Sequence, residues 1–131
     1  MTLKLCLKPG ETLHLGTSTV TVVSHQTTTL LIDGDIAVLR GGMVDAPADS
    51  AHCLLRLCWL VQQIYLSGEP QSLFANYFET ALILVRDHPE LASEVVKATA
   101  LLTDNRVYLA FRHLTELRKR FAPDCAASEL H

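Results

Sequence analysis

The fold of this chain is decided by a stretch that begins LKLCLKPGETLHLG at residues 3–16 and ends LLIDGDIAVLR at residues 30–40. Leucine occupies every second position of residues 3–7, which is the period of a strand with one buried face. Pro9-Gly10 then supplies the chemistry of a tight turn. The sequence therefore predicts that the chain opens with a half-buried strand and a sharp reversal.

Four more strands are predicted in the rest of this stretch. Every position of residues 19–23 is threonine or valine, and β-branched side chains favour strands. Asp33-Gly34 fits a tight turn before the last strand. Because the strands are short and joined by short turns, we expect them to pair antiparallel. The other three strands are expected at residues 13–15, 27–32 and 36–39.

The hydrophobic period changes to that of helices in the second part of the chain. Asp49 or Ser50 is expected to cap a first helix, whose apolar stripe runs from Leu54 to Tyr65. Asp104 is expected to cap the last helix. The later apolar stripes predict helices over residues 74–85, 91–102 and 104–121.

These patterns predict the fold class and the domain organisation. A chain of 131 residues suits one compact domain or a small module joined to a second one. We predict an α+β protein in which a small antiparallel five-stranded β-module is followed by a helical module of three to four helices. The predicted boundaries are residues 1–48 for the β-module and 49–131 for the helical module.

The charge balance restricts how the chain can bind nucleic acid. The net charge is −3, whereas proteins that bind mainly by coating phosphates are usually basic. The first 49 residues carry only three basic side chains, Lys4, Lys8 and Arg40, against five acidic ones. Any nucleic-acid binding must therefore come from a local patch.

The sequence carries no pattern typical of an enzyme or a metal protein. Its four cysteines form no Cys-x-x-Cys pair, its histidines are scattered, and no phosphate-loop or dinucleotide motif occurs. We expect no catalytic residue, no metal and no cofactor. With no signal peptide and no apolar run of about 20 residues, we expect a cytoplasmic protein that does not enter the membrane and has free thiols.

Arg40 is the residue with the clearest functional interpretation. It ends the last predicted strand, and a guanidinium can bond phosphates or base edges and stack on bases. The residues alone leave a second interpretation open, in which Arg40 only pairs with a surface carboxylate. The carboxylates considered are those of Asp33, Asp35 and Asp45.

The amino-terminal strands resemble the carbon-storage regulator family of small RNA-binding proteins. The matching text is GETLHLG at residues 10–16, the β-branched residues 19–23, and AVLR at residues 37–40. In that family the first and last strands frame the RNA site, and the arginine that ends the last strand is central to it. The resemblance implies RNA contacts at Leu5, Lys8 and Arg40, with added phosphate attraction from Lys4.

The whole chain resembles the FlbT family, which regulates the translation and stability of flagellin messenger RNA. LKPGE at residues 7–11 and Leu39-Arg40 match the β-rich part of the family pattern. VQQIYL at residues 61–66 and YLAF at residues 108–111 match its helices. The motifs occur in the family's order across residues 3 to 121.

These resemblances imply a non-enzymatic, post-transcriptional regulator of flagellin synthesis. It would bind the 5′ untranslated region of flagellin mRNA through residues 1–48 and repress translation or promote decay. Residues 49–131 would serve dimerisation or bind a partner such as flagellin or a second flagellar regulator. The acidic balance leaves an alternative open: a protein-interaction module that binds flagellin, a flagellar chaperone or another flagellar regulator without touching RNA.

The first predicted helix also suggests an oligomer. Trp59 lies off its main apolar stripe, and the indole N–H needs a hydrogen-bond partner. A helix that is apolar on two sides in a small protein predicts a helix-mediated interface, and hence a homo-oligomer, dimer or higher. The candidate interface residues are Trp59, Tyr65 and Phe111.

Overall fold

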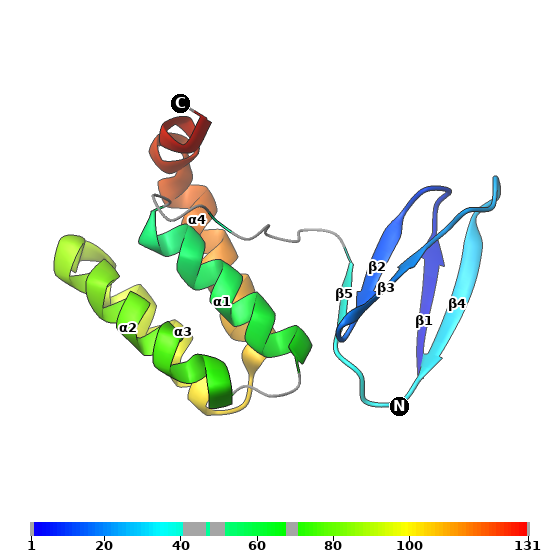
Figure 1. Cartoon of the computed structure of the whole chain (residues 1–131), viewed down its shortest axis with the longest axis horizontal. Coiled ribbons are helices and arrows are strands. Elements are labelled where there is room, and N and C mark those ends of the chain that lie inside the picture. The colour runs from blue at the N-terminus through cyan, green and yellow to red at the C-terminus, as the bar shows by residue number, and fades with distance from the viewer. Residues whose placement is uncertain (1, 41–46, 48–51, 68–70, 131) are drawn as a thin grey trace. The chain divides into compact units, whose positions relative to one another are not determined.

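The computed structural model describes residues 2–40, 47, 52–67 and 71–130, with side chains described as far as residue 121. Within these ranges five strands are followed by four helices, so the predicted α+β class is confirmed (Figure 1). The strands are β1 (Thr2–Leu7), β2 (Thr12–Leu15), β3 (Ser18–Thr21), β4 (Thr28–Asp33) and β5 (Val38–Arg40). The helices are α1 (Cys53–Ser67), α2 (Gln71–Asp87), α3 (Ala92–Thr103) and α4 (Val107–Leu130), with a 3₁₀ turn η1 (Pro89–Leu91) before α3.

The chain divides into two compact units. The first comprises residues 1–43 and 66–68 and holds all five strands; it is called the β-unit below. The second comprises residues 44–65 and 69–131 and is called the helical unit. Each unit is built on its own structural period, two residues in the strands and 3.6 in the helices.

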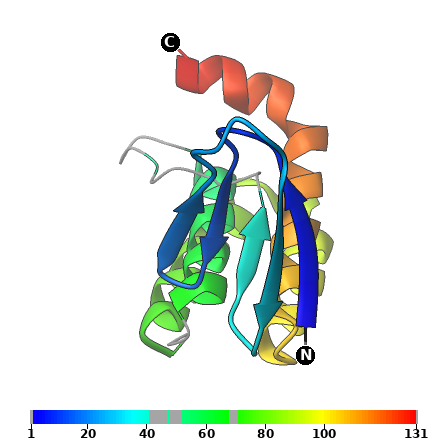
Figure 2. The ribbon, with the colours of Figure 1, turned by 90° about the vertical axis from the view of Figure 1, so that its right-hand side faces the viewer.

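The β-unit contains two small antiparallel sheets (Figure 2). In one, β1 pairs with β4, so that Leu5 lies opposite Leu30. In the other, β2 lies between β3 and β5, so that Leu13 faces Val20 on one side and Arg40 on the other. The antiparallel pairing predicted from the short turns is confirmed, although β1 pairs with β4 rather than with the strand that follows it.

The core of the β-unit is small. Leu7 and Leu13 are fully buried, and Val22 is nearly so. Alternation along the strands puts these apolar side chains on one face and polar residues on the other. Partly buried apolar residues complete this β-core: Leu5, Leu15, Leu30, Ile32 and Val38.

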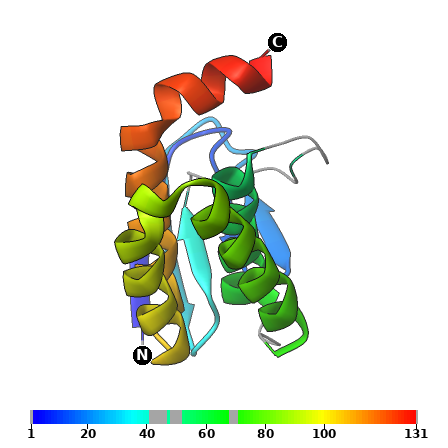
Figure 3. The ribbon, with the colours of Figure 1, turned by 90° about the vertical axis from the view of Figure 1, so that its left-hand side faces the viewer.

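The helices α1 to α4 pack together in the helical unit (Figure 3). Its core is larger than that of the β-unit. The apolar stripes expected in the last two helices are confirmed as buried. In the stripe expected over residues 74–85, Phe78 and Leu82 are exposed instead. The hydroxyl of the buried Tyr77 in α2 shares a hydrogen bond of 2.8 Å with the Thr99 hydroxyl in α3. The fully buried apolar side chains include Leu54, Leu57, Val61, Leu84, Ala98, Ala110 and Leu114.

The turn between α3 and α4 corrects one expectation. Asp104 does not cap the last helix; it is the carboxyl-terminal cap of α3, and Asn105 follows with a φ of 62°. Asn105 N–H donates to the Leu102 carbonyl and Arg106 N–H to the Leu101 carbonyl, the bond pattern of a Schellman motif. An asparagine thus takes the left-handed position that glycine usually fills, and α4 begins three residues later than expected.

The start of α1 is capped by a histidine. The expected caps, Asp49 and Ser50, lie outside the described residues. The Nδ1 atom of His52 accepts the Leu54 backbone N–H at 3.0 Å, and the His52 carbonyl accepts the Arg56 N–H. A ring nitrogen therefore serves here as the side-chain acceptor that serine or aspartate usually supplies.

Candidate nucleic-acid interface

The segment Lys8-Pro9-Gly10-Glu11 forms a tight turn after β1. Glu11 N–H donates to the Lys8 carbonyl at 3.0 Å, and Gly10 has a φ of 80°. Proline followed by a glycine of positive φ is the pattern of a type II turn. The Glu11 side chain closes the turn a second time, because its Oε1 accepts the Lys8 backbone N–H at 2.9 Å.

Backbone bonds fix this turn to the rest of the β-unit. Gly10 N–H donates to the Val22 carbonyl at 2.9 Å, and Val22 N–H donates to the Glu11 carbonyl at 3.0 Å. Leu13, two residues after Glu11, lies directly opposite Arg40 in the β2–β5 pair. Glu11 and Arg40 are therefore diagonal neighbours, at a separation that long side chains can span.

Arg40 and Glu11 form a bidentate ion pair. Arg40 Nε donates to Glu11 Oε2 at 2.6 Å, and Arg40 Nη2 donates to Glu11 Oε1 at 3.2 Å. The exposed fractions are 41% for the Arg40 side chain and 25% for that of Glu11, so the pair lies at the surface. A guanidinium has five N–H donors. Three of them have no hydrogen-bond partner among the described residues.

The pair is fully ionised at neutral pH. The hydrogen bond from Arg40 lowers the pKa of Glu11, and the Lys8 backbone N–H lowers it further. The same bond to Glu11 raises the pKa of Arg40. The pairing of Arg40 with a surface carboxylate thus occurs, but the partner is Glu11. Asp33 and Asp35 do not fill that role, and Asp45 lies outside the described residues.

The predicted RNA-contact residues are placed unequally. Lys8 and Arg40 are brought together, because the Lys8 backbone and the Arg40 side chain bond the same carboxylate. Lys4 is exposed on β1, on the same face as Cys6. Leu5 points to the other face and packs against the β-core, so its side chain is less available than those of the two lysines. Glu11, the centre of this cluster, was not predicted.

The predicted interface residues belong to the helices. Trp59 is partly buried in α1. The Tyr65 ring lies 5.5 Å from the Tyr108 ring, measured between centroids. Phe111 is buried within the single chain, so little of its side chain is available to a partner. An interface at Trp59 and Tyr65 remains a prediction.

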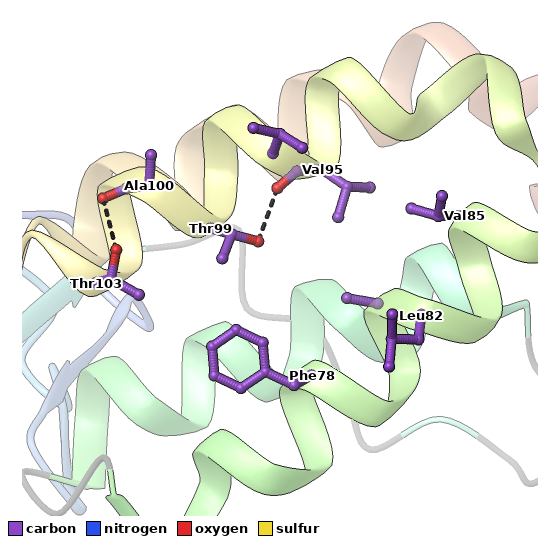
Figure 4. A pocket seen from close by; sticks show the side chains of 9 residues that line it. Phe78, Leu82, Val85, Val95, Thr99, Ala100 and Thr103 are labelled. Carbon is purple, nitrogen blue, oxygen red and sulfur yellow. Dashed lines mark hydrogen bonds between the residues drawn. The ribbon is translucent and has the colours of Figure 1, made fainter.

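An apolar groove lies between α2 and α3 (Figure 4). Its volume is about 490 Å³. The Thr99 hydroxyl donates to the Val95 carbonyl and the Thr103 hydroxyl to the Ala100 carbonyl, so both hydroxyls are used within α3. The groove therefore offers mainly methyl and methylene groups. The lining residues are Phe78, Ala81, Leu82, Val85, Val95, Val96, Thr99, Ala100 and Thr103.

A chain of hydrogen bonds links two histidines and a glutamate in the helical unit. His52 Nε2 lies 3.1 Å from His88 Nε2, and His88 Nδ1 lies 3.2 Å from Glu90 Oε1. Because His52 Nδ1 accepts the Leu54 N–H, its Nε2 carries the hydrogen and donates to His88. The Phe121 ring packs against both imidazoles. The bonds hold α1 to the α2–η1 turn; among the described residues, no cluster of three metal-ligating side chains occurs.

The described cysteines are free thiols, as expected. Cys6 is exposed on β1, whereas Cys58 is fully buried in α1. Burial raises the pKa of the Cys58 thiol to about 12. Among the residues that the structure describes, none of the helices combines the length and apolar character needed to cross a membrane.

Comparison with known proteins gives the family of the chain. Residues 3–121 match the family model described as "Flagellar protein FlbT". A "Probable flagellum biosynthesis repressor protein FlbT 1" of Bradyrhizobium diazoefficiens is 38% identical over 89 residues, which cover 66% of this chain and 57% of that relative. Relatives named "Probable flagellum biosynthesis repressor protein FlbT" from two strains of Rhodopseudomonas palustris are 30% identical over 92% of this chain and 94% of their own length. No solved structure matches. The chain belongs to the FlbT family of flagellar proteins.

Proposed function

We propose that this chain is a non-enzymatic repressor of flagellin synthesis, which binds the 5′ untranslated region of flagellin mRNA and lowers its translation or lifetime. The relatives are named flagellum biosynthesis repressors, which supports the flagellar role. The observation that carries the RNA role is the Arg40–Glu11 pair. It presents at the surface, next to Lys8, a guanidinium with three N–H groups that no described residue bonds.

The chemistry of this cluster suits a single-stranded nucleic acid. The open edge of Arg40 can donate two parallel hydrogen bonds to a base edge or to a phosphate. Lys8 and Lys4 add point charges that attract phosphates. Since Glu11 balances one positive charge, the cluster neutralises few phosphates, and its affinity should depend only moderately on salt.

The direct test is a titration of the purified chain against its own flagellin leader. Arg40→Ala should weaken binding by about 1–3 kcal/mol, because it removes a bidentate contact. Arg86→Ala is the matched control, since Arg86 is an exposed arginine on α2 paired with its neighbour Asp87. An Arg40→Ala variant that binds the leader as tightly as the Arg86→Ala variant would exclude Arg40 from the site.

We assign different roles to the two parts of the chain. The proposed RNA-binding module is residues 1–48, and residues 49–131 are the proposed module for dimerisation and partner binding, in a cytoplasmic homo-oligomer. Trp59→Asp should change the oligomeric state, measured by light scattering, while far-UV circular dichroism reports folding. A folded variant with unaltered mass would refute the interface.

A second candidate function is a protein-interaction module without RNA binding. The groove between α2 and α3 favours it, because exposed apolar surface of this kind commonly receives an apolar helix. The candidate partners are flagellin, a flagellar chaperone or another flagellar regulator. Leu82 is 73% exposed at the groove, so Leu82→Glu should abolish binding of purified flagellin in calorimetry if this function holds. Binding of the flagellin leader with an affinity that falls as salt rises, together with no binding of flagellin, would decide against it.

A further inference from the structure

We infer that Glu11 is the positioning residue of the RNA site and determines its specificity, by holding Arg40 for base edges rather than phosphates. The inference rests on the proposed RNA-binding function and deepens it. The Lys-Pro-Gly-Glu turn that carries Glu11 has no role in the resemblance to RNA-binding families beyond its match in sequence. In the structure this turn presents one carboxylate to Arg40 in a fixed place.

The Glu11 carboxylate is held rigidly. The Glu11 backbone donates to Lys8 and accepts from Val22, and the Glu11 side chain accepts the Lys8 N–H. The positive φ of Gly10 and the fixed φ of Pro9 leave the turn little freedom. An acceptor fixed at both its backbone and its side chain can orient a flexible partner at small entropic cost.

Glu11 bonds one particular edge of the Arg40 guanidinium. It bonds the Nε and Nη2 atoms of Arg40, which form the side-on edge. The remaining donors are both hydrogens of Nη1 and one of Nη2. One hydrogen from each Nη atom forms the end-on edge, so two parallel N–H groups lie in one plane for a ligand with two neighbouring acceptors.

The pairing with Glu11 also changes the electrostatic attraction of Arg40 for a ligand. Arg40 and Glu11 together carry no net charge, and a phosphate approaching Arg40 also approaches the Glu11 carboxylate. The attraction of a phosphate to this arginine is therefore reduced, because it depends mainly on net charge. Hydrogen bonds to the edge of a neutral base depend mainly on the orientation of the N–H donors, and the pairing with Glu11 preserves the orientation of those on Arg40. The pair should favour a base edge, while Lys8 and Lys4 provide phosphate attraction without sequence preference.

The experiment compares two RNAs: the flagellin leader and a scrambled RNA of the same length and composition. Affinities of the full chain for both are measured at several salt concentrations for wild type, Glu11→Gln and Glu11→Ala. Glu79→Gln is the matched control, because Glu79 is an exposed glutamate on α2. Thermal unfolding of each variant is followed in parallel.

The two RNAs should respond differently to the loss of the Glu11 charge. Both Glu11 variants should lower the leader-to-scramble affinity ratio by at least about fivefold, the lower end of discrimination for a bidentate base contact. Affinity for the scrambled RNA should stay equal or rise. Its log–log salt slope should steepen by about 0.7, since a released Arg40 can neutralise one phosphate. Loss of folding alone cannot produce these changes, because it weakens binding to both RNAs.

The contrary outcomes are distinct. A wild-type chain that prefers the leader, with an unchanged ratio and salt slope in both Glu11 variants, would overturn the inference and leave the proposed function standing. A parallel loss of binding to both RNAs in both variants would also overturn it, because a positioning residue controls discrimination. A wild-type chain that binds neither RNA would overturn the proposed function itself.

Discussion

The two units of the molecule are stabilised in different ways. The core cluster of the β-unit centres on Leu7, Leu13 and Val22, and β5 is tied to the first turn by a surface ion pair. The helical unit buries side chains from every helix, and ion pairs also join its helices, such as that between Glu94 of α3 and Arg120 of α4. The candidate RNA site therefore lies on the unit with the smaller core, whereas the apolar groove lies on the unit with the larger one.

The difference in core size affects how each unit supports its candidate binding surface. A small core contributes little to stability, so polar bonds in the turns of the β-unit must also hold its strands in place. In the β-unit the same carboxylate serves the fold and the candidate site. In the helical unit the exposed residues of the groove, such as Leu82 and Val96, can be altered without touching the buried core. The following predictions test that separation.

The largest effect is expected from truncating one buried leucine in each unit. Leu13 in β2 and Leu114 in α4 are both fully buried. Leu13→Ala and Leu114→Ala should each lower the unfolding free energy of their own unit by about 2–5 kcal/mol, through lost burial and the cavity that remains. Chemical denaturation followed by Trp59 fluorescence reports the helical unit, and NMR of β-strand amides reports the β-unit.

The same pair separates the functions of the units. Leu13 lies opposite Arg40 in the sheet, so Leu13→Ala should also weaken binding of the flagellin leader. Leu114→Ala should leave leader affinity within about twofold, as long as the β-unit stays folded. Equal losses of affinity in the two variants would show that the units do not act separately.

A smaller effect is expected at Gly10. Its φ of 80° disfavours any other residue, although an added Cβ would meet no atom within 4 Å. Gly10→Ala should therefore cost about 1–2 kcal/mol through backbone strain alone. Gly10→Asn is the control, since asparagine tolerates this conformation better, and its loss measured by thermal unfolding should be smaller. Equal losses would point to a different cause than strain.

In the helical unit, the buried hydroxyl of Tyr77 allows a test of one polar interaction. Tyr77→Phe removes the hydroxyl that bonds Thr99 and should lower stability by about 0.5–1.5 kcal/mol. The control is Tyr108→Phe, because Tyr108 is exposed and its variant should change stability by less than about 0.5 kcal/mol. Urea denaturation with Trp59 fluorescence measures both. A neutral Tyr77→Phe would mean that the buried hydroxyl contributes nothing.

The smallest effect is a pH dependence in the β-unit. Pairing with Arg40 lowers the pKa of Glu11 in the folded chain. The stability it contributes is therefore present above the ordinary glutamate pKa of about 4.3 and is lost as the pH falls through the lowered value. The difference in melting temperature between wild type and Glu11→Gln should shrink between pH 7 and pH 3. A constant difference would indicate that the Glu11 charge does not stabilise the fold.

The sequence predicts the elements of both units well, because each has a clear hydrophobic period. Alternating leucines and β-branched runs identify the strands, and apolar stripes identify the helices. The order of strands could not be predicted, since the pairing of β1 with β4 depends on contacts distant in sequence. The expected cap at Asp104 was wrong because an aspartate before a helix and one after a helix look alike in sequence, and Asn105 marks the difference only through its φ.

The candidate site could be predicted only in part. Arg40 is predicted from its place at a strand end and Lys8 from the resemblance to the carbon-storage regulator family, but Asp33 and Asp35, two of the aspartates expected to pair with Arg40, are not its partners. Glu11 is, and in the sequence it looks like plain turn chemistry. The available signal was the turn itself, because the residue after Pro-Gly in this type II turn directly precedes β2, and β2 pairs with β5. Diagonal neighbours across such a pair become visible only when the register is known.

The contrast between Cys6 and Cys58 makes each unit chemically addressable. Alkylating reagents attack the thiolate, so the exposed Cys6 should react quickly. Cys58 is buried and has a raised pKa, so it should react only when α1 opens. In a variant retaining only these two thiols, the slow phase of modification times the opening of the helical unit. Modification of Cys6 in the fast phase should not change the rate at which Cys58 reacts, and mass spectrometry measures the modification of both thiols.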